Sequence, residues 1–158
     1  MLRLLDEFED ICLIYKPKRS ITSGKFNYIS QLKRICERLL QDPRAVILDY
    51  NINPWIPIAV ADMCISMPFE SPAIAALHYG KPAIFHDPCN IALHHRYNAF
   101  PDITTHNYGE LESKISRWLL NKENGLFISE RSSLSELTGI YPKTNSTERL
   151  RKYLSSIF

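Results

Sequence analysis

The sequence predicts an α/β fold, namely a single Rossmann-like domain over residues 1–158 with helices on both faces of a parallel sheet. Short apolar runs of strand length alternate with segments in which apolar residues recur at helical spacing. Within the runs, apolar and polar residues hardly alternate, which is typical of strands covered on both faces. No internal repeat or linker divides the chain, and its length suits one core.

The composition is that of an ordinary globular protein and argues against several classes. Hydrophobic residues make up 45% and charged residues 23% of the chain. The net charge of +2 is too small to indicate nucleic-acid binding. No apolar run approaches the roughly 20 residues that cross a bilayer, and the acidic N-terminal segment is not that of a signal peptide. We expect a cytoplasmic protein, compatible with a peripheral position at the inner face of the membrane.

The first part of the chain predicts three helices and two strands. Apolar spacing or an apolar run indicates, in order, a helix over 2–9, a strand over 11–15, a helix over 28–41, a strand over 45–48 and a short helix over 55–60. The two strands are expected to be buried.

Residues 61–88 form the segment around which the chain is organised. They predict a strand over 63–66, a helix with Ser71 as N-cap and Pro72 at its first position, an end at Gly80, and a strand over 83–85. A strand that leads into a helix N-terminus favours an anion, because backbone N–H groups and the helix dipole point there. The segment therefore predicts a phosphate-bearing ligand.

The last part of the chain predicts an edge strand and two capped helices. The edge strand falls within 100–105, and Asn107 with Glu110 forms a capping box for the helix that follows. Asn145 with Glu148 repeats this pattern. The apolar residues of the final helix are expected to face inward: Leu150, Tyr153, Leu154 and Ile157.

Several of these segments resemble the C-terminal, donor-binding domain of GT-B glycosyltransferases, nearest to bacterial enzymes of capsule and other surface polysaccharides. The segments are 14–17 (Ile-Tyr-Lys-Pro), 61–66, 70–77 and 80–85, followed by the helix after Asn107. The resemblance covers roughly residues 9–120. It implies a nucleotide-sugar donor as ligand, with no separate cofactor.

The resemblance also implies roles for particular residues. Ser71 and the N–H groups after it would hold a donor phosphate, and Glu70 would hydrogen-bond a ribose or sugar hydroxyl. Lys16 would approach the diphosphate as a point charge, and Ser66 with Met67 would line the floor. The sequence departs from the family pattern, since it lacks a second acidic residue on the helix and a glycine-rich loop.

Histidines complete the expected site. His86 ends a strand, and His94, His95 and Arg96 fall in a loop near the ligand side, where cationic donors suit a phosphate. Helical His78 is expected at the surface. The nucleotide-sugar-binding residues are then Lys16, Ser66, Glu70, Ser71, His86, His94 and Arg96. No catalytic residue is assigned, and no spacing typical of a metal site is present.

GT-B enzymes have two such domains, with the acceptor site usually on the other one. We therefore expect an N-terminal GT-B domain or a partner subunit to supply that site, and the isolated chain to be inactive. Two alternatives stay open. One is a non-catalytic Rossmann-like binding or assembly module, and the other is a fragment of an enzyme like the sugar-nucleotide 2-epimerases.

The cysteines carry no motif, because no C-x-x-C pair is present. Cys12 and Cys64 are expected within strands and Cys36 on a helix, each as a small buried hydrophobe. Cys89 is expected in a loop, with its role open.

Overall fold

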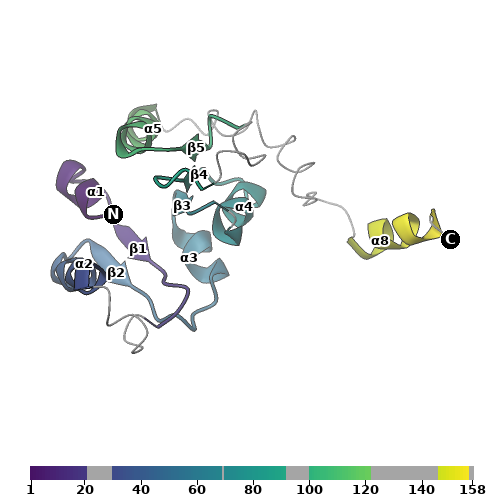
Figure 1. The fold of residues 1–158 in the computed structure, drawn as a ribbon, viewed down its shortest axis with the longest axis horizontal. Helices are drawn as coiled ribbons and strands as arrows, with labels where there is room; N and C mark the ends of the chain where they lie inside the picture. Colours follow the sequence, from purple (N-terminus) through teal and green to yellow (C-terminus); the bar gives the residue numbers. More distant parts are fainter. Residues whose placement is uncertain (21–29, 69, 92–99, 122–145, 157–158) are drawn as a thin grey trace. The chain divides into compact units, whose positions relative to one another are not determined.

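The computed structural model describes residues 1–20, 30–68, 70–91, 100–121 and 146–156 (Figure 1). It consists of two compact units, residues 1–64 and 65–158, and each is described here by itself. Helices and small sheets with parallel strand pairs make up the chain, so the predicted α/β class is confirmed. The single Rossmann-like domain over 1–158 stays a prediction.

The first unit contains the three helices and two strands that the sequence predicts. They are α1 (Leu2–Glu7), β1 (Leu13–Tyr15), α2 (Ser30–Gln41), β2 (Ala45–Ile47) and α3 (Trp55–Val60). β1 and β2 pair in parallel, from Leu13 opposite Ala45 to Tyr15 opposite Ile47.

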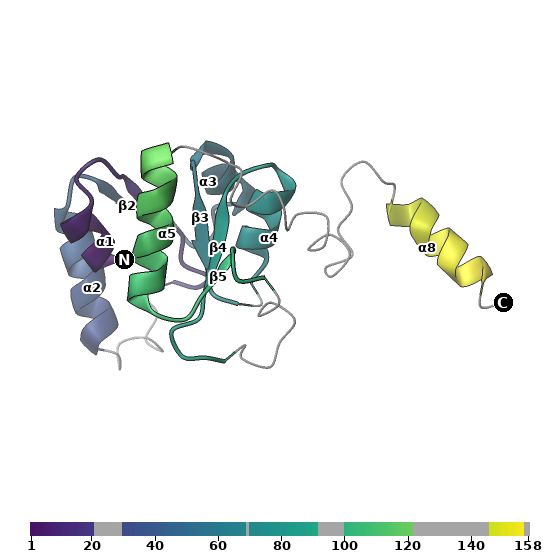
Figure 2. The same cartoon turned by 90° about the horizontal axis from the view of Figure 1, so that it is seen from above.

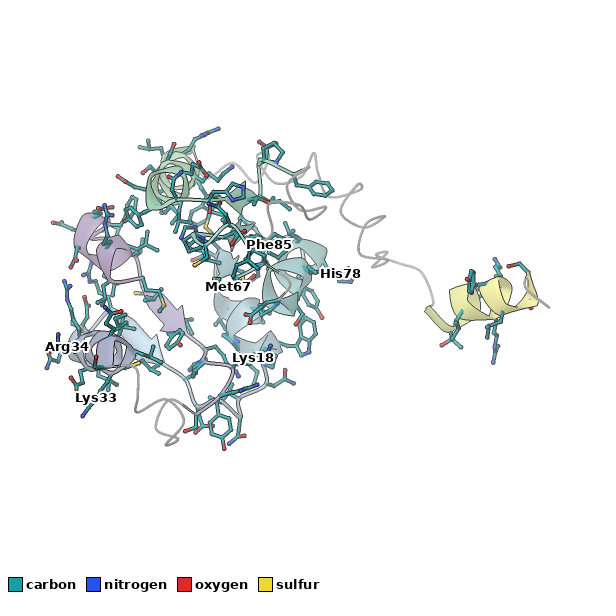
Figure 3. The ribbon with its side chains drawn as sticks, viewed as in Figure 1. Lys18, Lys33, Arg34, Met67, His78 and Phe85 are labelled. Atoms are coloured by element: carbon teal, nitrogen blue, oxygen red, sulfur yellow. The ribbon has the colours of Figure 1, made fainter. Side chains whose placement is uncertain are left out.

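Helix α2 packs on β2 through one apolar face. Cys36 and Leu39 are buried there, whereas Lys33 and Arg34 point away from the strand pair (Figure 3). The two strands are less covered than predicted, since Val46 in the middle of β2 is 52% exposed. The expectation that both are buried is wrong, because a pair of three-residue strands covered by few elements leaves alternate side chains open.

The guanidinium group of Arg44 ties the end of α1 to the turn before β2. Its Nη2 donates to the carbonyl oxygen of Leu5 at 2.8 Å, and its Nη1 donates to that of Phe8 at 2.9 Å. The Asp42 carboxylate accepts from Nε at 3.1 Å and from Nη2 at 2.9 Å. Arg44 thus satisfies carbonyl groups that a helix end leaves without partners.

The second unit is built on a sheet of three strands in the order β3–β4–β5. Its elements are β3 (Cys64–Ser66), which begins at the boundary of the unit, α4 (Ser71–His78), β4 (Ala83–His86), β5 (Thr104–Thr105) and α5 (Tyr108–Asn121). β4 and β5 are parallel. Figure 2 shows α4 and α5 on opposite sides of this sheet, as the sequence predicts.

Strand β4 forms the centre of the core in this unit. Ala83, Ile84 and Phe85 have no exposed surface, and Phe85 lies in the interior (Figure 3). Around them, the other buried apolar residues are Ala73, Ala75, Ala76, Leu77, Phe100, Ile103, Leu111 and Ile115. β4 therefore confirms the expectation of a strand covered on both faces.

The start of α4 lies one residue earlier than predicted. Glu70 is the N-cap, with φ −97° and ψ 138°, and Ser71 and Pro72 are the first two helical residues. The prediction that Ser71 caps the helix is therefore wrong. The side chain of Glu70 makes no capping hydrogen bond to the first turn.

Helix α4 ends in a Schellman motif at Gly80, the residue at which the sequence predicts the end of this helix. Gly80 has φ 83°, which an L side chain rarely adopts. Its N–H donates to Leu77 at 3.1 Å, and the N–H of Lys81 donates to Ala76 at 2.9 Å. The glycine turns the chain from the helix directly into β4.

The two C-terminal helices differ in how well the sequence predicted them. The capping box of α5 is confirmed, because the Glu110 N–H donates to Asn107 Oδ1 at 3.0 Å and the Asn107 amide donates to Glu110. Helix α8 (Ser146–Ser155) was expected to face inward. It does not: the apolar side chains described on it are exposed, namely those of Leu150, Tyr153 and Leu154.

Substituting alanine at two glycines should give effects of opposite sign. Gly80→Ala places a side chain at φ 83°, which costs about 1–2 kcal/mol. Gly109 lies early in α5, and among the described residues a Cβ there would meet Asn107 Oδ1 at 3.4 Å, an ordinary van der Waals distance. Gly109→Ala should therefore stabilise by up to about 1 kcal/mol. Urea unfolding measures both changes, and a Gly80→Ala variant as stable as the wild type would contradict the strained geometry.

Arg44→Lys should lower the melting temperature, because lysine cannot bond the Asp42 carboxylate and the carbonyl oxygens of Leu5 and Phe8 at once. Arg38→Lys is the matched control, since Arg38 pairs with Asp6 with both side chains largely exposed. An exposed pair of this kind contributes little. Thermal unfolding followed by circular dichroism compares the two variants. Equal melting temperatures would show that the Arg44 contacts do not hold α1.

Candidate functional site

The most suitable part of the second unit for a ligand is the link from β3 to α4. An N-terminal helix turn presents backbone N–H groups and the positive end of the helix dipole. At α4 the N-cap side chain makes no capping hydrogen bond, and Ser71 is exposed at the first turn. The link therefore offers backbone donors to a ligand.

The other predicted residues of this link have distinct surroundings. Ser66 ends β3 and is partly buried, and its hydroxyl donates to the carbonyl oxygen of Met67 at 3.3 Å. Glu70 is partly buried at the N-cap. Ser66, Glu70 and Ser71 thus lie between the end of β3 and the start of α4, within six residues of one another. Their roles toward a nucleotide sugar stay predictions.

A second group of polar side chains lies where β4 and β5 end. The register of this parallel pair sets His86 opposite Thr105, so their side chains are on the same face. His86 Nδ1 and Thr105 Oγ1 are 2.9 Å apart and hydrogen-bonded. Ligands of open α/β sheets bind outside the carboxyl ends of the strands, and His86 occupies such an end.

Burial decides the charge of His86. Burial lowers the pKa of the imidazole below its usual value of 6.5, and nearby His106 lowers it further, whereas Asp87 and Glu110 act in the opposite direction. His86 is therefore neutral at pH 7. A phosphate would meet an uncharged donor at this residue, because the partly buried ring loses the hydration that its charged form needs. The role of His86 toward a phosphate stays a prediction.

Asp87 follows His86 and fixes the turn after β4. It is fully buried. Its N–H donates to the carbonyl oxygen of Thr105 at 2.7 Å, and its carboxylate accepts from the N–H of Ile91 at 2.9 Å. Asn90 within this turn has φ 52°, a conformation that asparagine tolerates better than most residues. Asp87 thus extends the pairing of β4 with β5 by one residue.

Sequence reasoning missed Thr105 and His106 as members of this group. His106 Nδ1 is buried and has no hydrogen-bond partner, and Trp118 Nε1 on α5 is the other such atom in the described ranges. The His106 N–H donates to Glu110 at 2.7 Å. The sequence contained a signal, because Thr105 ends the predicted edge strand and His106 follows it. Only the register of β5 places Thr105 beside His86.

The remaining predicted site residues are Lys16, His94 and Arg96. Lys16 follows β1 in the first unit, where its ammonium donates to the carbonyl oxygens of Tyr50 at 2.7 Å and Pro17 at 3.0 Å. These bonds fix the chain at the end of the β1–β2 pair. His94 and Arg96 lie outside the described residues. His78 is exposed on α4, as predicted (Figure 3).

Metal binding and membrane insertion find no support in the ranges that the structure describes. No group of three or more histidine, cysteine and acidic side chains could hold a metal ion there. Among the helices described, none is long and apolar enough to cross a membrane.

The four cysteines should differ in reactivity. Cys12 and Cys89 are exposed, and the expectation that Cys12 is buried in a strand is wrong because β1 begins only at Leu13. Burial raises the pKa of the Cys64 thiol to about 11. At pH 8 Cys64 should carry roughly a hundredfold less thiolate than an ordinary thiol. Iodoacetamide labelling read by peptide mass spectrometry should modify Cys12 and Cys89 first. Labelling of Cys64 at the same rate would contradict its burial.

Comparison with known proteins identifies a family but no individual relative. No curated protein and no solved structure matches the chain significantly. One family model, described as polysaccharide biosynthesis PFTS motif protein, matches residues 1–115, which is more than half of the chain. The chain therefore belongs to the polysaccharide biosynthesis PFTS motif protein family.

Proposed function

We propose that this chain binds the nucleotide-sugar donor of a glycosyltransferase that builds a surface polysaccharide such as a capsule. In this proposal the phosphates lie at the first turn of α4, and Ser66 and Glu70 contact the remainder of the donor. The acceptor site comes from a further GT-B domain or a partner subunit, so the isolated chain turns over no substrate.

The observation that carries the proposal is the start of α4. The helix follows β3 after a four-residue link, its N-cap residue Glu70 makes no capping hydrogen bond from the side chain, and Ser71 is exposed at its first turn. A phosphate fits such a position, because the N–H groups of Ser71 and Ala73 and the helix dipole act on the same negative charge, whereas Pro72 has no N–H. Membership of a polysaccharide biosynthesis family is consistent with an activated sugar as the ligand.

The name of the family points to the same link. Read as one-letter codes, PFTS differs at one position from residues 68–71 of this chain, Pro-Phe-Glu-Ser, in which Glu70 stands in place of threonine. Ser71, the last residue of the four, is the first residue of α4. The motif after which the family is named would thus coincide with the proposed phosphate position.

The proposal is tested by substituting Ser71 in two ways. Ser71→Ala removes the hydroxyl, whereas Ser71→Pro removes the hydroxyl and the backbone N–H. Proline suits the first position of a helix, and the extended conformation of Glu70, with ψ 138°, suits a residue before proline. The pair therefore separates the backbone donor from the side chain without breaking the helix.

Isothermal titration with uridine, guanosine and cytidine diphosphates, CMP and the matching nucleotide sugars should find one series that binds. Ser71→Pro should weaken its binding by about tenfold or more, the effect of one hydrogen bond to a charged group. Ser71→Ala should weaken it less. Unchanged melting temperatures show that both variants fold.

Two results would count against the proposal. If the Ser71→Pro variant and the wild type bind the nucleotide with equal affinity, the phosphate does not bind at the first turn of α4. The absence of binding by any nucleotide would favour the non-catalytic binding or assembly module instead.

A further inference from the structure

The hydrogen bond between Thr105 and His86 has a defined direction. Thr105 is fully buried. In the described part of the chain its hydroxyl has one hydrogen-bond partner, His86 Nδ1 at 2.9 Å. A buried hydroxyl that does not donate leaves its proton without an acceptor, which is unfavourable. The hydroxyl of Thr105 therefore donates, and His86 Nδ1 accepts.

This direction determines where the proton of the imidazole resides. A neutral histidine carries one N–H, and the hydrogen bond of the other nitrogen decides which one it is. Because Nδ1 accepts from Thr105, the proton of His86 is on Nε2. His86 Nε2–H has no hydrogen-bond partner in the described ranges. The residue thus has one fixed donor at the carboxyl end of β4.

The surroundings of His86 disfavour a negatively charged partner for this donor. The carboxylates of Asp87 and Glu110 both act on the ring electrostatically. A phosphate placed at Nε2 would be repelled by these two charges and would meet a neutral donor. An uncharged oxygen does not have this disadvantage, and sugar hydroxyl groups are such oxygens.

We propose that His86 donates a hydrogen bond from Nε2 to a hydroxyl oxygen of the bound nucleotide sugar, and that Thr105 is the positioning residue that keeps the proton on Nε2. This inference rests on the proposed function and assigns one contact within it. The hydroxyl belongs either to the ribose or to the transferred sugar.

The order of the strands is consistent with one ligand that contacts both the first turn of α4 and His86. β3 and β4 are neighbours in the sheet and are connected through α4, the type of crossover that joins parallel strands. The ends of neighbouring strands are separated by about 5 Å. A phosphate at the first turn of α4 and a hydroxyl at His86 are therefore within the span of one nucleotide sugar.

The first measurement concerns the ligand-free protein. Long-range ¹H–¹⁵N NMR spectra report which imidazole nitrogen carries the proton, and we expect the Nε2–H form for His86 at pH 7.5. Thr105→Val keeps the shape of the buried side chain but removes the hydroxyl, and it should shift His86 toward a mixture of both forms. Thr105→Ser keeps the hydroxyl and should restore the Nε2–H form. A merely structural role of Thr105 would leave these spectra unchanged.

The second measurement is the affinity for the nucleotide sugar and for the matching nucleoside diphosphate. His86→Leu should weaken nucleotide-sugar binding about tenfold, whereas His86→Gln, whose amide can donate from nearly the position of Nε2, should restore much of it. If the hydroxyl belongs to the ribose, His86→Leu weakens binding of both ligands. If it belongs to the transferred sugar, only the nucleotide sugar is affected.

The two measurements separate this inference from the proposed function. If the wild type and the His86→Leu variant bind the nucleotide sugar with equal affinity, the inference is overturned and the proposed function is unaffected. An Nδ1–H form in the wild type overturns the role of Thr105. A wild type that binds no nucleotide refutes the proposed function and the His86 contact with it. Melting temperatures of all variants control for folding.

Discussion

The burial and pairing of β4 is the constraint on which the second unit depends. Three consecutive residues of this strand have no exposed surface, so β4 cannot shift by one residue without turning Phe85 away from its place in the core. Its pairing with β5 fixes His86 opposite Thr105, and the N–H of Asp87 continues that pairing. The polar group at the end of the strand is thus positioned by the apolar residues before it.

The chain approaches this strand through an equally fixed connection. The Schellman motif at Gly80 turns the end of α4 directly toward β4, with two hydrogen bonds to the last turn of the helix. The start of the same helix follows β3. One helix therefore links the phosphate position proposed at Ser71 to the strand that carries His86, and its length is set at both ends by local backbone chemistry.

Local signals made most of the fold predictable from the sequence. Proline, glycine and capping residues act within a few positions of the chain, so the bounds of α3 and the capping box of α5 were predicted correctly. Burial depends on contacts between distant segments, and there the predictions were less accurate. Amphipathic spacing in α8 indicated a buried face, but spacing alone does not tell what covers it.

The same distinction applies to the candidate site. The sequence identified the start of α4 and His86, because both follow directly from strand and helix boundaries. It did not identify Thr105, since the register between two parallel strands connected by a long segment is not encoded locally. The charge of His86 likewise depends on more than the local sequence, because burial lowers its pKa.

The bonds of Arg44 to α1 have a consequence for how this region tolerates mutation. The acceptors that α1 and its following residues provide are backbone carbonyl oxygens of Leu5, Phe8 and Glu9, not their side chains. Every amino acid supplies the same carbonyl group. Substitutions at exposed positions near the end of α1 therefore leave these hydrogen bonds in place. Replacement of Arg44 by another amino acid removes them, and replacement of Asp42 removes the bonds between its carboxylate and the guanidinium.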